Sequence, residues 1–136
     1  MAVIGLFVNL PIKDLEKTIA FWTGLGFSFD PKFTNKDAGC LIISTSVQAM
    51  LLTEPFFTGF SKKPIPDPLK GNEAILALSV DSRQEADTIA DKALTLGGSK
   101  ANESYDHGFM YGRSFLDPDS HMWEVFWMDP KGPPAP

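Results

Sequence analysis

The residues with the clearest chemical potential lie in segment 109–128, FMYGRSFLDPDSHMWEVFWM. Two runs of strand-forming residues flank 117–120, whose proline and aspartates favour a turn, so we predict a β-hairpin with a four-residue loop. Counting outward from this loop pairs Arg113 with Glu124, and opposed residues share one face of a hairpin. In such a pair, the arginine can bind a ligand carboxylate or carbonyl, while the glutamate accepts a hydrogen bond or acts as a base.

The hairpin face that is predicted to carry this pair is otherwise aromatic and apolar. Its members are Phe109, Tyr111, Arg113, Phe115, Met122, Glu124 and Phe126, whereas Met110, Gly112, Ser114, Trp123 and Val125 form the face expected to pack under a helix. An apolar cavity with few polar anchors is typical of a small-molecule site. The alternative is a structural cross-strand ion pair worth only ~0.2–1 kcal/mol.

One histidine lies just before the hairpin. His107 stands between Asp106 and Gly108, which would place it at the mouth of such a cavity. Histidine titrates near neutral pH, so it is available as an acid or a base. The simpler alternative is a solvated loop histidine.

The elements that must position these residues form a repeated pattern. The first half is expected to contain a strand at 3–10, a helix from its N-cap Asp14 to Gly24 and Gly26, an edge strand within 27–33, and strands at 40–43 and 49–53. After a connector, the second half is expected to contain a strand at 74–80, a helix from Asp81-Ser82 to Gly97-Gly98, a weak strand at 100–103, and the hairpin. The same β-α-β-β-β order therefore occurs twice.

The composition restricts the classes of function. The chain has 136 residues and a net charge of −5, which indicates one domain and argues against binding to nucleic acid or to an anionic membrane. The single Cys40 lies in an apolar run, so we expect a buried, reduced thiol. Because the sequence shows no leader and no long apolar run, we expect a cytoplasmic protein without a membrane span.

Phenylalanine is abundant, with 11 residues. Phe56, Phe57 and Phe60 cluster at the start of the connector, where a short helix is expected. They either cover a ligand or close the end of the hydrophobic core, and the sequence leaves both interpretations open.

In order and spacing, these segments resemble the vicinal oxygen chelate superfamily, which includes glyoxalase I, bleomycin-resistance proteins and extradiol dioxygenases. The residues that carry the resemblance are Phe7–Leu15, Phe21-Trp22, Leu25–Phe27, Leu78–Asp81 and Leu116–Glu124. The resemblance implies an α+β fold in which two tandem βαβββ modules pair their mixed sheets into an open cup, commonly within a homodimer. The expected boundaries are a single domain at 1–130, with module one at 1–54, a linker at 55–72 and module two at 73–130, and then a disordered tail at 131–136.

The resemblance also concerns metal binding. Catalytic members of this superfamily typically hold a divalent metal, with one His or Glu from the first and last strand of each module. The corresponding positions are Phe7, Leu51, Ile75 and Glu124, of which only Glu124 can bind a metal. Moving the Leu51 position to Glu54 would still give two carboxylates and no histidine. We therefore expect no metal site and no cofactor.

Two functional hypotheses follow. The first is a glyoxalase-like or bleomycin-resistance-like protein that binds a small, partly apolar molecule. The second is a lyase or dioxygenase-type enzyme acting on a carbonyl-containing substrate, either metal-free through Glu124, His107 and Arg113 or with a metal site placed elsewhere. A dimeric scaffold with a vestigial cup is a third option.

The residues expected to bind the ligand are Phe7, Asn9, Leu51, Phe56, Phe57, Ile75, Phe109, Tyr111, Arg113 and Glu124, and strand alternation also turns Thr53 and Ala77 inward. The expected partners are a small molecule and a second copy of the chain.

Overall fold

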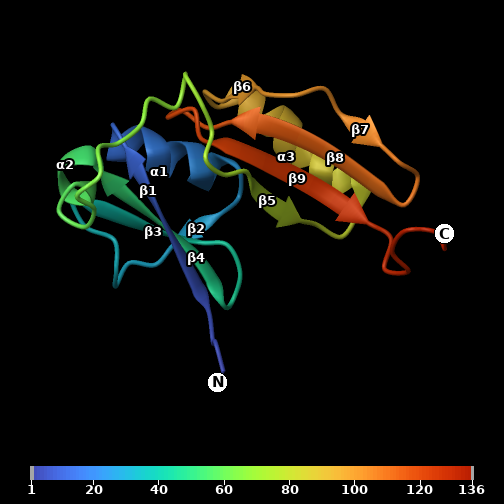
Figure 1. Ribbon diagram of the computed structural model, residues 1–136, viewed down its shortest axis with the longest axis horizontal. Helices are drawn as coiled ribbons and strands as arrows, with labels where there is room; N and C mark the ends of the chain where they lie inside the picture. The colour runs from blue at the N-terminus through green and yellow to red at the C-terminus, as the bar shows by residue number, and fades with distance from the viewer. Residues whose placement is uncertain (1, 136) are drawn as a thin grey trace. The chain divides into compact units, whose positions relative to one another are not determined.

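The computed structural model describes residues 2–135, which form an α+β fold with two mixed sheets (Figure 1). The chain divides into two units, one ending at Asp67 and the other starting at Pro68. Each unit contains one βαβββ module, and the second also has a short additional strand. The predicted α+β fold with two tandem modules is therefore confirmed. Within residues 2–135, no helix is long and apolar enough to cross a membrane.

The first unit is built on a sheet with strand order β1-β4-β3-β2. Its elements are β1 (Leu6–Ile12), α1 (Leu15–Gly24), β2 (Ser28–Phe29), β3 (Ala38–Ile42), β4 (Val47–Thr53) and α2 (Glu54–Phe57). Strands β1 and β4 are parallel, and the other pairs are antiparallel. Helix α1 begins after Asp14, whose side chain accepts a hydrogen bond from the Lys17 amide, as expected of an N-cap.

Strand β1 differs from its predicted bounds. The sequence indicates a strand that Pro11 ends, whereas β1 continues through Pro11 to Ile12. Strand β1 pairs only with β4 and is therefore an edge strand. An edge strand tolerates proline because only one of its two sides takes part in the hydrogen-bond ladder.

Helix α1 contacts β2, β3 and β4. The core of the first unit lies between α1 and one face of this sheet. Leu41, Ala49 and Leu51 are fully buried, and their strand positions alternate with those of the other face. Gly39, the strand partner of Leu51, lies so close to α1 that an added Cβ would be 3.3 Å from a Leu15 methyl group.

The second unit is built on a sheet with strand order β5-β9-β8-β6, in which β7 also pairs with β8. Its elements are β5 (Leu76–Ser79), α3 (Arg83–Thr95), β6 (Ser99–Lys100), β7 (Tyr105–Asp106), β8 (Met110–Leu116) and β9 (Met122–Met128). Strand β5 runs parallel to β9, and the remaining pairs are antiparallel. Helix α3 begins after Ser82, whose side chain accepts from the Glu85 amide at 3.0 Å.

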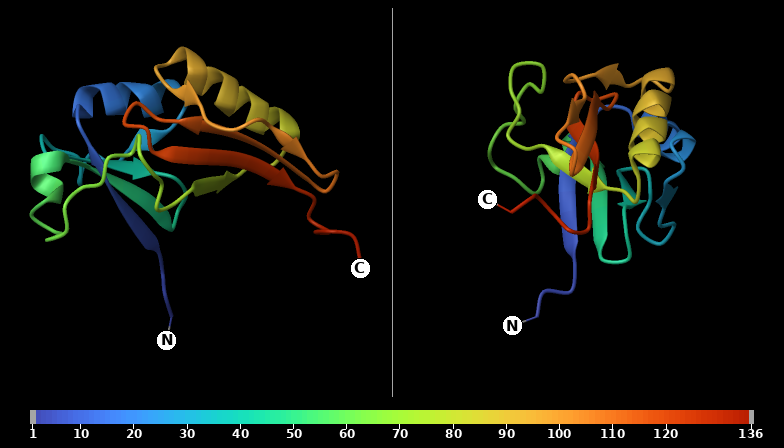
Figure 2. Two further views of the ribbon diagram at one scale, coloured as in Figure 1. Left: turned by 45° about the horizontal axis from the view of Figure 1, so that its top comes forward. Right: turned by 90° about the vertical axis from the view of Figure 1, so that its right-hand side faces the viewer.

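Helix α3 lies along one face of the second sheet (Figures 1 and 2). Its alanines Ala86, Ala90 and Ala93 are fully buried, and so are Phe115, Trp123 and Val125 on the sheet. Because side chains alternate along a strand, the neighbours of these sheet residues point to the opposite face. We call the two sides of this sheet the α3 face, which carries Phe115 and Val125, and the Glu124 face, which carries Ala77, Glu124 and Phe126.

Candidate functional site

The β8–β9 hairpin pairs one residue away from the predicted register. Arg113 lies opposite Val125, and Glu124 lies opposite Ser114. Since side chains alternate, a shift of one residue places Arg113 and Glu124 on opposite faces of the sheet. The predicted Arg113–Glu124 pair is therefore wrong, and so is the prediction that Arg113 and Glu124 share one face.

The cause lies in the hairpin loop. The predicted turn does form, with the Ser120 amide donating to the Asp117 carbonyl at 2.9 Å. Ser120 then adopts a left-handed conformation with a φ of 67°. The Asp117 amide donates to the His121 carbonyl at 3.0 Å, and the pairing of the two strands begins beyond this hydrogen bond. A turn followed by a left-handed residue adds one position to a hairpin loop, which accounts for the shift.

The buried side chain of Asp117 holds this loop in place. One carboxylate oxygen accepts from the amides of Asp119 and His121, and the other accepts from the Trp123 indole at 2.9 Å. Burial raises the pKa of Asp117 above its ordinary value. Asp117 thus fixes both the loop and the orientation of Trp123 towards α3.

The α3 face holds Arg113 in a structural network. Its guanidinium bonds to Asp87 and to Asp91 on α3, each at 2.8 Å, and the Tyr111 hydroxyl also donates to Asp87. The Tyr111 hydrogen bond, followed by that from Arg113, lowers the pKa of Asp87. The predicted ligand residues Tyr111 and Arg113 therefore tether the helix to the sheet, and they do not lie beside Glu124.

A second cation strengthens this tether. Arg83, at the start of α3, donates to both carboxylate oxygens of Asp106 and to the Gly108 carbonyl at 2.8 Å. Its guanidinium also lies over the rings of Tyr111 and Trp127, at 5.3 and 5.1 Å from their centres. Arg83 therefore fixes the segment between β7 and β8 against the helix.

The Glu124 face carries a tyrosine–carboxylate pair. The Tyr105 hydroxyl donates to Glu124 Oε1 at 2.7 Å, and both side chains are half-buried. The ring of Tyr105 lies over Gly112 in β8, where an added Cβ would overlap the ring atoms. Burial, together with the Glu124 bond, raises the pKa of Tyr105 to about 12. Tyr105 is therefore protonated at neutral pH and acts as a hydrogen-bond donor.

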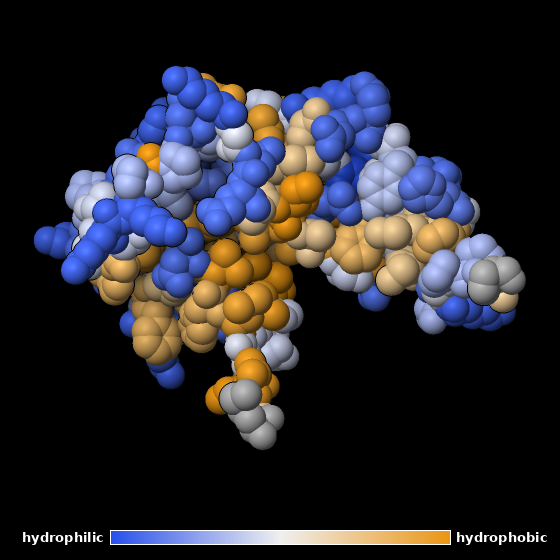
Figure 3. Space-filling model, viewed as in Figure 1, coloured by the Kyte–Doolittle hydropathy of each residue, from blue (hydrophilic) through white to orange (hydrophobic). Residues whose placement is uncertain are grey.

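The surroundings of this pair are mostly apolar. Ala77 lies beside Glu124 in the sheet, and Phe126 lies one position further along the same face, next to Ser79. Figure 3 shows apolar side chains over β9 on the side of the sheet away from α3. This face therefore combines one carboxylate and one hydroxyl with an apolar surface.

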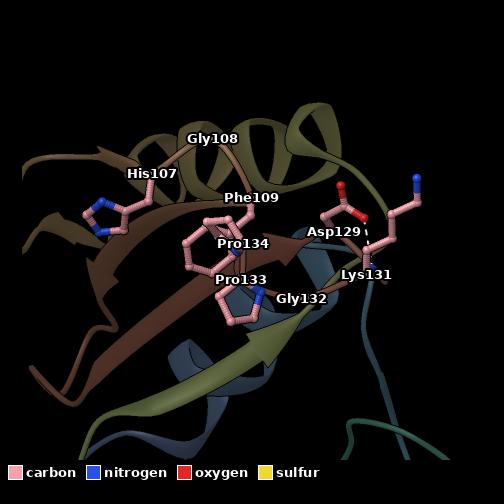
Figure 4. A pocket seen from close by; sticks show the side chains of 8 residues that line it. All are labelled: His107, Gly108, Phe109, Asp129, Lys131, Gly132, Pro133 and Pro134. Atoms are coloured by element: carbon pink, nitrogen blue, oxygen red, sulfur yellow. Dashed lines mark hydrogen bonds between the residues drawn. The ribbon is translucent and has the colours of Figure 1, made fainter. Parts of the chain in front are cut away.

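His107 and Phe109 lie next to the pair. The ring of His107 stacks on Tyr105 with the centroids 5.2 Å apart, and on Phe109 at 6.5 Å. A shallow hollow of about 380 Å³ adjoins them and is lined by His107, Gly108, Phe109, Asp129, Lys131, Gly132, Pro133 and Pro134. In Figure 4 the Phe109 ring lies beside the two prolines, while the imidazole points away from them. Disorder of the tail at 131–136 stays a prediction, and residue 136 lies outside the described residues.

In the first unit, Leu51 contradicts its predicted role. Leu51 is fully buried on the α1 side of the sheet, so it cannot line a cavity on the other side. The register places Phe7, Asn9 and Met50 on the opposite face, where Phe7 is 57% exposed. Thr53, the other residue of β4 that is expected to turn inward, lies opposite Ile12 on the same α1 side. The residues of β4 that face away from α1 are therefore one position from the predicted ones.

The remaining predicted residues lie at element ends. Phe56 and Phe57 are in α2, which contacts β1 and β4, and Phe56 meets Phe60 edge-to-face at 5.1 Å. Ile75 directly precedes β5 and is 55% exposed. Their predicted contact with a ligand stays a prediction.

Tyr105 and Gly112 are the residues of this site that the sequence interpretation missed. A glycine inside a predicted strand often marks the close approach of another group, and Gly112 is such a glycine. The partners of Arg113 could also have been found, because Arg83, Asp87 and Asp91 recur at helical spacing and form a polar stripe.

The residues around Glu124 do not fit a divalent metal. Its neighbours in the sheet are Ala77 and Ser114, which bring neither a second carboxylate nor an imidazole. A catalytic zinc site normally uses three protein ligands. Across residues 2–135, no three His, Cys, Asp or Glu side chains gather in a way that could hold a metal ion.

The comparisons with known proteins agree with this fold. The family model described as Glyoxalase/Bleomycin resistance protein/Dioxygenase superfamily matches residues 6–125. The comparison with curated proteins gave no match.

Several solved structures are similar. A hypothetical protein, SA1046, from S. aureus is 24% identical with a TM-score of 0.78, covering 93% of this chain and 95% of that one. A glyoxalase/bleomycin resistance protein/dioxygenase family enzyme from Burkholderia phytofirmans PsJN is 17% identical with a TM-score of 0.73, covering 90% and 96%. The fosfomycin resistance protein FosX from Listeria monocytogenes is 17% identical with a TM-score of 0.66, covering 100% and 95%. At these identities the similarity shows a shared fold.

Proposed function

The chain belongs to the Glyoxalase/Bleomycin resistance protein/Dioxygenase superfamily, whose model matches residues 6–125, and we propose that it binds a small, partly apolar molecule at the Glu124 face without a divalent metal. The single observation that carries this proposal is the Tyr105–Glu124 pair at 2.7 Å within an apolar surface. Sparse polar anchors on an apolar surface suit the recognition of a small molecule.

The metal-free part of the proposal rests on ligand chemistry. Of the positions that the family resemblance assigns to metal ligands, Phe7, Leu51 and Ile75 have hydrocarbon side chains that cannot bind a metal ion, and moving the Leu51 position to Glu54 would add only one carboxylate. An ion held by Glu124 alone would keep mostly water around it, and burying its charge without compensation is costly. Glu124 by itself therefore does not make a divalent-metal site.

The position of Arg113 favours the binding hypothesis over the enzymatic one. The enzymatic alternative needs a group that stabilises a developing enolate oxygen, and Arg113 was its strongest candidate. Its guanidinium is instead bound by Asp87 and Asp91 on the α3 face. The Tyr105 hydroxyl near Glu124 already donates to that carboxylate.

Thermal unfolding in the presence of metals tests the metal-free part. A ligand at a hundred times its dissociation constant stabilises the native state by ~2.7 kcal/mol, which should raise the midpoint by at least ~5 °C. We expect Zn, Ni, Mn, Fe(II) and Mg to give shifts within noise. A clear rise with one of these ions that is lost in Glu124→Ala would overturn this part.

Fluorescence titration with the neutral probe naphthylmethanol tests binding. Phe126→Ser removes an aromatic side chain from the Glu124 face and should weaken binding by about tenfold. Leu94→Ser is the matched control, because Leu94 is an exposed apolar residue on α3. Equal weakening in both variants would mean that the probe adsorbs to apolar surface in general.

We also propose that the chain forms a homodimer. Four exposed apolar residues lie along or just before the edge strand β1, namely Val3 (80% exposed), Ile4 (90%), Leu6 (57%) and Phe7 (57%). Exposed apolar residues on an edge strand favour association. Sedimentation that gives only monomer across micromolar concentrations would exclude this dimer.

A further inference from the structure

We propose that the molecule bound at the Glu124 face carries a protonated amine beside its apolar part, and that Glu124 selects this cation. This inference rests on the proposed function and adds the chemical class of the ligand. It reverses the expectation from the sequence, in which Arg113 would select a carboxylate or a carbonyl.

The charge of the Glu124 face favours a cation. The ion pairs of the second unit include Arg83–Asp106, Lys100–Glu103 and those of Arg113 with Asp87 and Asp91. None of these pairs includes Glu124. A half-buried carboxylate without a counter-charge attracts a cationic ligand and repels an anionic one.

The hydrogen bonds at Glu124 also favour a ligand that donates. Tyr105 occupies Oε1 of Glu124 as a donor, and no hydrogen bond within residues 2–135 reaches Oε2. An ionised carboxylate only accepts hydrogen bonds, so a ligand at Oε2 must donate. Hydrogen bonds from an ammonium group to a carboxylate are shorter and about twice as strong as neutral ones.

The Glu124 carboxylate is also held in one orientation by its neighbours. The Tyr105 ring contacts Gly112, and Asp106, the next residue, is held by Arg83. Tyr105 is thereby fixed from both sides, and it fixes Glu124 in turn. An anchor that is already oriented loses less conformational entropy on binding. Ala77 and Phe126 then offer apolar contact to the rest of the ligand.

Isothermal titration calorimetry at neutral pH with three matched probes tests the inference. Naphthylmethylamine, naphthylmethanol and naphthoic acid share one apolar body and differ in charge. The wild type should bind the amine at least tenfold more tightly than the alcohol, and naphthoic acid more weakly than either. In Glu124→Gln the amine and the alcohol should bind within about threefold of each other.

Two further variants serve as controls. Glu85→Gln removes an equal charge from α3, on the other side of the sheet, and should keep the full preference for the amine. Tyr105→Phe retains the carboxylate and should also keep a preference for the amine, so it tests the inference even if Glu124→Gln folds poorly.

The outcomes separate the two proposals. Equal binding of all three probes by the wild type would overturn the cation selectivity and leave small-molecule binding intact. Binding of none of them at millimolar concentration would overturn the proposed function itself. A preference for the amine that persists in Glu124→Gln would show that another group makes the selection.

Discussion

Tyr105 reaches across strand β8 to Glu124 on β9, and its hydroxyl donates to Glu124 Oε1 at 2.7 Å. The bond is possible because Gly112 lies between them and has no side chain. A carboxylate that the sequence placed beside an arginine is thus held by a tyrosine. This difference changes the chemistry of the face from a pair of opposite charges to a single oriented anion.

Replacing Gly112 with alanine should break this arrangement. An added Cβ would overlap the Tyr105 ring, so the ring must move away from Glu124. We expect a loss of about 1–3 kcal/mol in the free energy of unfolding, measured by urea denaturation, and a fall of the Tyr105 pKa towards its ordinary value of ~10. Gly71→Ala is the control, because its added Cβ would meet open space, and it should change neither quantity.

The raised Tyr105 pKa predicts a loss of stability at high pH. The folded pKa of about 12 lies above the unfolded value of ~10. The contribution of protonated Tyr105 to the free energy of unfolding is therefore complete below pH ~10 and disappears as the pH rises towards 12. Urea denaturation across this range should show a smaller loss in Tyr105→Phe than in the wild type. Identical pH profiles would mean that neither burial nor the Glu124 bond raises the pKa of Tyr105 in the folded protein.

The lowered Asp87 pKa predicts the opposite behaviour in acid. The Tyr111 and Arg113 hydrogen bonds favour the ionised form of Asp87. The contribution of this carboxylate to the free energy of unfolding is therefore present above pH ~4 and is lost as the pH falls through the lower folded pKa. Asp87→Asn should therefore lose less stability than the wild type between about pH 5 and pH 2, as measured by urea denaturation. An unchanged acid profile would show that the ionisation of Asp87 does not contribute to the stability of the folded protein.

Asp117 should be a sensitive residue of the hairpin loop. Asp117→Ala leaves the amides of Asp119 and His121 and the Trp123 indole without their acceptor, and we expect a loss of about 2–4 kcal/mol in the free energy of unfolding. Asp117→Asn keeps one acceptor oxygen and should lose less. Thermal or urea unfolding measures both, and a neutral effect of Asp117→Ala would show that the loop does not depend on this side chain.

The sequence predicted the local features of the fold well. Asp14 and Ser82 cap their helices, and Gly26 and Gly97 follow the helix ends with positive φ. Each of these features depends on a few neighbouring residues, and so does the repeated order of elements. For the same reason, the duplication could be recognised without any contact between distant segments.

The errors at the site have non-local or unusual causes. The hairpin register depends on Ser120, which adopts a left-handed backbone although it is not glycine. The position of Arg113 depends on carboxylates more than 20 residues away on α3, with separations of 26 and 22 residues. The hydrogen bond from Tyr105 to Glu124 spans strand β8, which lies between the two residues. Counting along a single hairpin captures none of these relationships.

The central claim is that a small molecule binds at the Glu124 face, and methyl-region NMR spectra recorded with naphthylmethanol test it most directly. Ala77 lies on the Glu124 face next to Glu124, whereas Val125 is fully buried on the α3 face of the same sheet. We predict that the Ala77 methyl resonance moves during the titration and that the Val125 methyl resonances stay in place. Movement of Val125 without Ala77, or no movement of either at millimolar probe, would contradict the account.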